Sequence, residues 1–196
     1  MDVFYEESSI AQNASKASKR YNVLNVFFWI FVFIGAIMLI GFLLFLGSIP
    51  LMIFFGLQAG TTAAIAFIFY RQKSRTNVSF DYTFVSGELR ISRVINVNKR
   101  KLMTRFEVEE ILQIGDVDSP SYDRFKADPS VKTVLCTSNE ESQEGKFFMY
   151  ILIGDNGKKL YVLECREELL MQIMKFAKRT ALDRDYVPQE KKALNK

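Results

Sequence analysis

Apolar positions gather in one long block near the start of the chain. Residues 23–70 contain 48 positions without a charge, and 37 of them are hydrophobic. A single helix of that length would measure about 70 Å, roughly twice the hydrocarbon core of a bilayer. The block therefore has to turn once, and Gly47-Ser48-Ile49-Pro50 supplies the break, because Gly and Pro interrupt helices. The pattern predicts a hairpin of two membrane-spanning helices, 23–46 and 51–70.

Basic residues flank this block and do not occur in its turn. They are Lys16, Lys19 and Arg20 before the first span, and Arg71, Lys73 and Arg75 after the second. Positive charge collects on the cytoplasmic side of membrane proteins, so a multi-pass protein of the cell membrane with both termini in the cytoplasm is predicted. Residues 1–22 lack the pattern of a cleaved signal peptide and are expected to form a cytoplasmic N-terminal segment.

Small residues recur at every fourth position of the second span, at Gly56, Gly60 and Ala64. This spacing lets two helices approach closely. The partner helix is either the first helix of the same hairpin or, in a homo-oligomer, a helix of another copy. Gln58 is the most polar side chain of that span, and it either bonds across the hairpin or marks a pathway through it.

Hydrophobic alternation with a period of two follows the hairpin after a linker at residues 71–79. It predicts seven strands, at residues 80–84, 89–95, 101–106, 108–114, 131–137, 147–153 and 158–164. Asn156-Gly157 favours a tight hairpin turn between the last two strands. Residues 115–130 are expected to form a loop, because they contain Pro120 and Pro129.

Helical spacing replaces the alternation at residues 166–179, where Leu169, Ile173 and Phe176 share one apolar face. Residues 180–196 are expected to be a polar, fraying tail. The fold class predicted is therefore a membrane α-helical hairpin plus an α+β domain at residues 80–179. In that domain seven antiparallel strands form a β-sandwich or barrel, and the C-terminal helix caps it.

This order of elements resembles the pleckstrin-homology-like (PH-like) fold. It is similar to the small bacterial membrane proteins in which a two-span hairpin precedes a PH-like domain, here Phe80–Glu164 as strands and Arg166–Arg179 as helix. In PH domains that bind phosphoinositides, the loop between the first two strands is basic, whereas the matching loop predicted here is Ser86-Gly87. The helix of such domains usually carries a Trp, and the single Trp of this chain is Trp29. The resemblance therefore does not imply phosphoinositide recognition.

Basic residues concentrate in the second and third predicted strands and in the turn between them. They are Arg90, Arg93, Lys99, Arg100, Lys101 and Arg105. Such a cluster close to a membrane attracts anionic lipid headgroups or an acidic partner. The alternative is a solvated strand face that binds nothing. Nucleic acid is not expected, because no aromatic residues alternate with the basic ones as stacking platforms.

The loop Tyr122-Asp123-Arg124-Phe125 offers two aromatic side chains that either pack back onto the sheet or form a binding edge. The aspartates around this loop lack the glycine and the terminal glutamate of a calcium-binding loop, so no metal site is expected.

Catalytic signatures are missing from the sequence. The chain has no His, and its two cysteines, Cys136 and Cys165, are expected to be reduced and buried. No glycine-rich phosphate loop, Cys-x-x-Cys pair or nucleophile elbow is present. The chain, with a net charge of +4, is therefore expected to use no cofactor and to be a non-enzymatic scaffold or adaptor. It would present a PH-like binding surface to membrane lipids or a protein partner. The alternative is a small transport or channel subunit whose hairpin self-associates.

Overall fold

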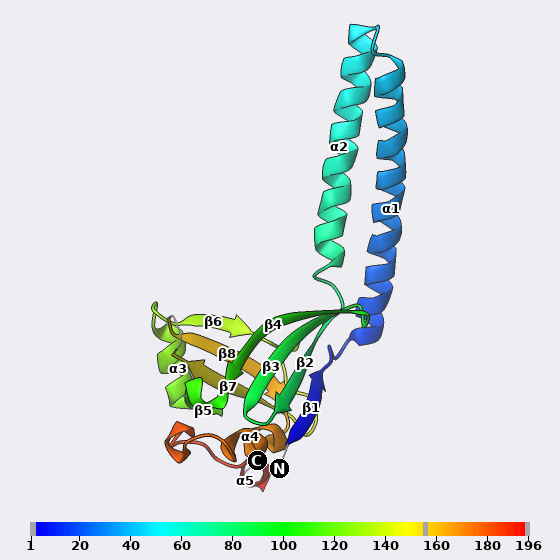
Figure 1. Cartoon of the computed structure of the whole chain (residues 1–196). Coiled ribbons are helices and arrows are strands. Elements are labelled where there is room, and N and C mark those ends of the chain that lie inside the picture. Colours follow the sequence, from blue (N-terminus) through cyan, green and yellow to red (C-terminus); the bar gives the residue numbers. More distant parts are fainter. Residues whose placement is uncertain (1–2, 155–156, 195–196) are drawn as a thin grey trace. The chain divides into compact units, whose positions relative to one another are not determined.

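The computed structural model describes residues 3–154 and 157–194, and it divides into two compact units. One unit is the helical hairpin, Asn13–Asn77. The other combines the N-terminal residues up to Gln12 with the chain from Val78 onward. The second unit contains all the described strands (Figure 1). It is therefore built from two separate stretches of sequence, with the hairpin inserted between them.

The hairpin consists of α1 (Ala14–Leu44) and α2 (Ile49–Lys73). α2 begins at Ile49, within the break expected from the sequence, with Ser48 as its N-cap and Pro50 in its first turn. α1 begins nine residues earlier than predicted, because the polar stretch before Val23 continues the helix. By length and composition, both helices could cross a membrane.

The first sheet contains the N-terminal strand, which the sequence pattern did not reveal. Its strands lie in the order β1-β2-β3-β4, all antiparallel: β1 (Phe4–Ser9), β2 (Val78–Val85), β3 (Glu88–Ile95) and β4 (Lys99–Glu107). β1 pairs along its whole length with β2, from Phe4 opposite Val85 to Ser9 opposite Phe80. The N-terminal segment therefore supplies an edge strand of the domain, residues 4–9, and the start of α1 from residue 14.

β1 lacks the apolar alternation of a half-buried strand because its inward side chains are mostly polar. Tyr5, Glu7 and Ser9 share the row of the buried β2 residues Phe84, Tyr82 and Phe80. Only Tyr5 of the three is hydrophobic. The pattern of inner and outer positions therefore lacks the apolar repeat that identifies a half-buried strand.

The second sheet has the order β5-β7-β8-β6. Its strands are β5 (Ile111–Asp116), β6 (Lys132–Leu135), β7 (Phe147–Ile153) and β8 (Lys159–Cys165), and a 3-10 turn at Val108–Glu110 leads into β5. β6 runs parallel to β8, so the prediction of a purely antiparallel domain was wrong for this strand. The turn between β7 and β8 includes Asp155 and Asn156, which lie outside the described residues. The two sheets do not close into a barrel.

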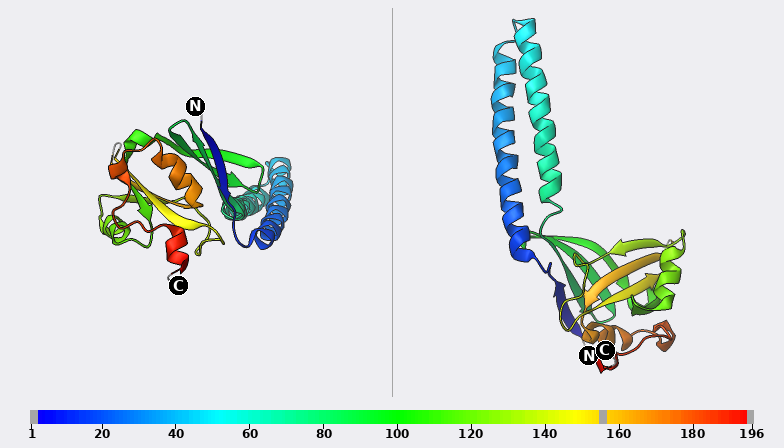
Figure 2. Two further views of the ribbon diagram at one scale, coloured as in Figure 1. Left: turned by 90° about the horizontal axis from the view of Figure 1, so that it is seen from below. Right: turned by 180° about the vertical axis from the view of Figure 1, so that it is seen from behind.

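α4 (Glu167–Met174) closes one end of the space between the sheets (Figure 2). Its Leu169, Leu170 and Ile173 are buried in the main core, which confirms the predicted capping helix. The helix ends five residues before the predicted end. Phe176 then follows in a turn and packs edge-on against Phe84, with ring centroids 5.6 Å apart.

Two predicted irregular segments are ordered instead. The loop at 115–130 contains α3 (Pro120–Ala127), which begins with Ser119 as its N-cap and Pro120 in its first turn. That combination is a standard helix start. The C-terminal segment contains a 3-10 turn at Arg179–Ala181 and a short helix α5 (Gln189–Leu194). Ala181 and Asp183 of this segment are buried, so it is not a fraying tail.

Candidate functional site

The predicted basic cluster lies on β3 and β4, with Lys99 and Arg100 in β4 and not in the turn, and it does not form one face. In the paired register, Arg90 lies opposite Arg105, and Arg93 lies opposite Lys101. Arg93 is also in register with the buried Phe80, so it belongs to the inner row of the sheet. Arg90, Arg100 and Arg105 belong to the outer row. The basic residues therefore divide between the two faces, and no single face carries all of them.

Two arginines of the outer row already have acidic partners. Arg90 donates two hydrogen bonds to Glu88, of 2.7 and 3.2 Å, and this contact lowers the pKa of the Glu88 carboxyl. Arg100 lies 3.3 Å from Asp81 and 3.9 Å from Glu6. Two of the basic residues that the sequence pattern assigned to anionic lipid or an acidic partner therefore pair with carboxylates of the chain itself.

Lys99, Lys101 and Arg105 differ from those arginines, because none of them forms an ion pair with a described residue. All three are exposed residues of β4. β4 is an edge strand, so its outer backbone groups face away from β3. The remaining basic charge therefore follows the open edge of the first sheet.

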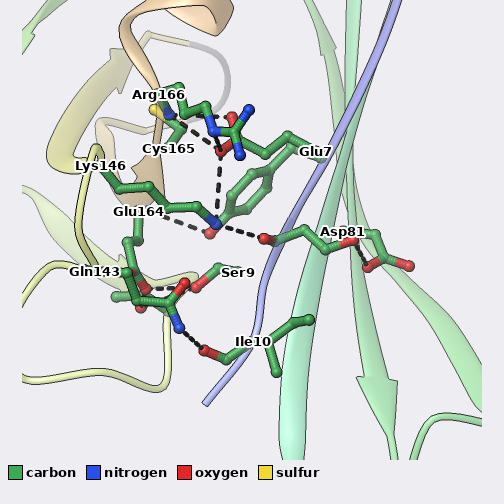
Figure 3. A network of polar contacts seen from close by, with 12 residues as sticks. Glu7, Ser9, Ile10, Asp81, Gln143, Lys146, Glu164, Cys165 and Arg166 are labelled. Carbon is green, nitrogen blue, oxygen red and sulfur yellow. Dashed lines mark hydrogen bonds and ion pairs between the residues drawn. The ribbon is translucent and has the colours of Figure 1, made fainter. Parts of the chain in front are cut away.

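A buried polar network joins β1 to the second sheet (Figure 3). At its centre lies Glu164 on β8, with 0 % of its surface exposed. Glu164 Oε2 accepts hydrogen bonds from Ser9 Oγ at 2.6 Å, Thr137 Oγ1 at 2.9 Å and Asn139 Nδ2 at 2.6 Å. Glu164 Oε1 accepts one from the Gln143 backbone N–H at 3.0 Å. Four donors therefore converge on one buried carboxylate.

These donors control the ionisation of Glu164. Burial raises the pKa of its carboxyl, but the hydrogen bonds from Ser9, Gln143, Asn139 and Thr137 outweigh burial and lower the pKa below its usual value. The side chain is therefore held as a carboxylate in the interior. A buried charge of this kind is stable only while its donors remain in place.

A second buried carboxylate, Glu7 of β1, extends the same network. It accepts hydrogen bonds from the Arg166 backbone N–H at 3.2 and 3.0 Å, and Lys146 Nζ lies 3.5 Å away. Lys146 also donates to the Ser8 carbonyl at 2.6 Å. β1 is therefore fixed by side chains as well as by its pairing with β2. The sequence offered no signal for these roles, because the partners are far apart along the chain.

The two cysteines are free and fully buried, as the sequence predicts. Burial raises the pKa of the Cys136 thiol to about 12, and it also raises that of Cys165. Such thiols are poor nucleophiles at neutral pH. Among residues 3–154 and 157–194, no group of three or more Cys, Asp or Glu residues could hold a metal ion.

An acidic groove of about 1200 Å³ lies between the loop before β7, the start of α4 and the C-terminal segment. Phe147, Phe148 and Val187 supply apolar walls. The acidic lining residues are Asp116, Asp118, Glu140, Glu141, Glu167, Glu168 and Glu190. Lys192 of α5 lies 2.8 Å from Asp116 and 3.0 Å from Asp118. Lys192 of the chain itself therefore already binds part of this acidic surface.

The aromatic side chains around α3 pack inward. The ring of Tyr122 lies 5.9 Å and that of Phe125 6.1 Å from the ring of Tyr150. Both belong to a small core that covers the outer face of the second sheet. The packing interpretation of this segment is therefore confirmed.

The small residues of α2 are divided between two environments. Gly56 faces α1, and a Cβ placed there would lie 3.4 Å from the ring of Phe42. Gly60 and Ala64 are exposed, and a Cβ at Gly60 would meet nothing within 4 Å. The close approach of α1 to α2 instead involves Gly35 against Thr62 and Gly41 against Phe55. Gln58 is also exposed, and its side chain makes no hydrogen bond to another described residue.

Two β-sheets that do not close, capped by a helix and interrupted by an apolar helical hairpin, define a PH-like domain with an insertion. A family model described as "Bacterial PH-like domain (DUF6106)" matches residues 9–183, and the chain belongs to this family. The matched range contains the hairpin, so the expectation of a PH-like domain confined to the C-terminal side of the hairpin was wrong. Searches of curated proteins and of solved structures give no match.

The inserted hairpin also changes which loop joins the first two strands. With β1 included, that connection is the segment from Ile10 to Asn77 and not Ser86-Gly87. The segment carries the basic residues Lys16, Lys19, Arg20, Arg71, Lys73 and Arg75. The short, uncharged loop Ser86-Gly87 therefore joins the second and third strands, β2 and β3, and not the first two.

Proposed function

We propose that this chain is a non-enzymatic scaffold that presents a PH-like binding surface at the cytoplasmic face of the bacterial cell membrane. The observation that carries the proposal is the insertion of an apolar hairpin between two directly paired strands, β1 and β2. A single terminal anchor leaves a domain on one flexible connection. An anchor inside a β-hairpin connects to the domain twice.

Both connections are short. Residues 10–13 join β1 to α1, and residues 74–77 join α2 to β2. Because an extended residue spans at most about 3.6 Å, such connections restrict how far the domain can move from the ends of the hairpin. A binding surface with this restriction would operate at the membrane and not at a distance from it, as suits an adaptor that collects partners there.

The orientation follows from charge. Basic residues precede and follow the apolar spans, and the turn at residues 45–50 has none. The turn should therefore face the outside, with the PH-like domain in the cytoplasm. We would label single cysteines at Ser48 and Asn13 with a membrane-impermeant maleimide in intact cells. The native cysteines are buried and serve as silent background. Labelling at Ser48 alone supports this orientation, and labelling at Asn13 alone overturns it.

The scaffold function itself is tested by exchanging the hairpin. Residues 23–70 would be replaced by an unrelated two-span hairpin of equal length, and a photo-crosslinking residue would be placed at exposed positions of the domain in native membranes. The proposal expects the same crosslinked partners with either hairpin. Loss of every partner on exchange, while the domain stays folded, would contradict it.

A second candidate function is a transport or channel subunit formed by several hairpins. The observation that favours it is the exposed surface of α2 with Gly60, Ala64 and the uncompensated polar side chain Gln58. Changes at these positions would then abolish assembly without affecting the PH-like domain. Crosslinking at Gly60 should, in that case, give multimers of this chain.

A further inference from the structure

The four edges of the two sheets differ in how they are covered. Side chains from the loop before β7 bind the backbone at β1, with Lys146 on the Ser8 carbonyl and Gln143 on the Ile10 carbonyl at 2.7 Å. The edge of β5 is covered by the C-terminal segment, because Leu182 bridges Ile114 and the Asp183 N–H donates to the Ile114 carbonyl at 2.8 Å. β6 is only four residues long. Covered or short edges are the usual protection against unwanted strand pairing.

β4 is neither covered nor short, so only its exposed charges and the bulge near Ile91 and Ser92 limit unselective strand pairing at this edge. It is nine residues long, and seven of them are exposed. No described strand pairs with its outer side. Two of its exposed residues are apolar, Leu102 at 53 % and Met103 at 38 %. A long edge with apolar side chains and free backbone groups can accept another strand.

The charges of β4 indicate which strand this edge would accept. Lys99, Lys101 and Arg105 are exposed and form no ion pair with the described residues. A strand added to β4 would place its side chains beside these groups on both faces of the sheet, since successive residues of a strand point to opposite faces. Acidic residues in such a strand would meet basic ones, and basic residues would be repelled.

We propose that the outer edge of β4 binds an extended acidic segment of a partner protein by strand addition. The proposal rests on the scaffold function and names the partner for it. Backbone hydrogen bonds would supply much of the affinity, whereas the lysines and Arg105 would select acidic side chains. Leu102 offers an apolar contact for one residue of the partner. A second copy of β4 is a poor occupant, because pairing two such edges would bring like charges together.

The test uses the full chain in nanodiscs of zwitterionic phosphatidylcholine, which contribute no anionic lipid. The probe is an eight-residue peptide with blocked ends and the sequence Val-Val-Glu-Glu repeated twice, so that Glu side chains reach both faces of the sheet. Two matched peptides serve as controls: one has Lys in place of Glu, and the other keeps Glu but has N-methylated amides that cannot pair as a strand. Binding is measured by fluorescence anisotropy, and the binding site by amide hydrogen exchange.

The proposal expects the Glu peptide to bind at least tenfold more tightly than either control peptide and to slow exchange of amides within residues 99–107. K101E/R105E should weaken binding at least tenfold. The matched variant K126E/K178E, which makes the same change in net charge at exposed positions outside β4, should change it less than twofold. Unchanged circular dichroism shows that each variant is folded.

Several results would overturn the proposal. Two concern the peptides: the Glu and Lys peptides bind equally well, or the N-methylated peptide binds as well as the Glu peptide. Two concern the site: amide hydrogen exchange is slowed only outside β4, or two copies of the chain pair through β4. If anionic vesicles slow amide hydrogen exchange in β4 and the Glu peptide does not, the edge binds lipid instead. The Glu peptide could fail to bind β4 while the crosslinked partners of the domain survive exchange of the hairpin. That pair of results would overturn strand addition at β4 and leave the scaffold function supported.

Discussion

Ser9 Oγ donates a 2.6 Å hydrogen bond to Glu164 Oε2 across 155 positions of sequence. The bond joins the N-terminal edge strand of one sheet to β8 of the other. Both residues are fully buried. β1 is the last element of the domain before the hairpin, so this contact fixes the point at which the chain leaves the domain for α1.

Replacing Ser9 by Ala should destabilise the PH-like domain. The change removes one of four donors from a buried carboxylate, and hydrogen bonds to charged groups contribute about 1.5–3 kcal/mol. We expect the thermal midpoint of the β-sheet signal to fall by about 5–10 °C, measured by circular dichroism in detergent micelles. Ser142→Ala, at an exposed position in the loop before β7, should leave the midpoint unchanged. Equal effects of the two variants would contradict the role assigned to Ser9.

Glu164 should make the stability of the domain depend on pH. Its pKa is lower in the folded protein than its usual value of 4.5, so its contribution is complete above that value and is lost as the pH falls through the folded pKa. Glu164→Gln cannot titrate. The difference in thermal midpoint between the natural protein and this variant should therefore shrink below about pH 4.5. A difference that stays constant from pH 7 to pH 3 would show that Glu164 is not held as a carboxylate.

Cys136 should resist alkylation in the folded protein. With a pKa of about 12, its thiolate fraction at pH 8 is about a thousandfold lower than that of a thiol with the ordinary value. Iodoacetamide followed by peptide mass spectrometry should show almost no labelling of either cysteine until the chain is unfolded in urea. Rapid labelling of folded Cys136 would show that the site is open to solvent.

Gly41 and Gly60 should respond differently to the same substitution. A Cβ at Gly41 would lie 2.8 Å from the ring of Phe55, whereas one at Gly60 meets nothing within 4 Å. Gly41→Val should therefore weaken the pairing of α1 and α2 by about 1–3 kcal/mol, and Gly60→Val should not. SDS titration of mixed micelles, followed by the fluorescence of the single Trp29, measures this difference. If Gly60→Val alone dissociates oligomers, the second candidate function gains support.

The PH-like domain should fold without its hairpin if β1 is kept. β1 and β2 are antiparallel neighbours, so a short loop can join them directly. Replacing residues 13–77 by Gly-Asn-Gly should give a soluble protein with the same β-sheet content and a cooperative thermal transition. The matched control is a fragment that begins at Val78. It lacks Glu7 and Ser9, leaves Glu164 with a missing donor, and should be far less stable.

The hairpin and the seven later strands were predictable because their signals are local. The apolar block is recognised from its composition alone, and a strand such as β7 is apolar over its full length. α3 could also have been found, from Ser119 followed by Pro120, but the prolines were interpreted as loop residues.

β1 and the network around Glu164 could not have been found in this way. Glu7 and Ser9 are polar residues on the inner side of a strand, and they are satisfied by partners more than 100 residues away. The parallel pairing of β6 with β8 also depends on tertiary contacts. The basic cluster was found, but its division between two faces depends on the strand register, which a β-bulge near Ile91 and Ser92 alters.

The discontinuous domain imposes an order on synthesis. β1 leaves the ribosome first, but its partner β2 emerges only after the whole hairpin has been translated, several seconds later at about 5–20 residues per second. During that interval the nascent strand has no sheet to join. Assembly of the β-sheets therefore waits for the hairpin, and a chain whose two helices fail to pair would hold its first strand away from the rest of its domain.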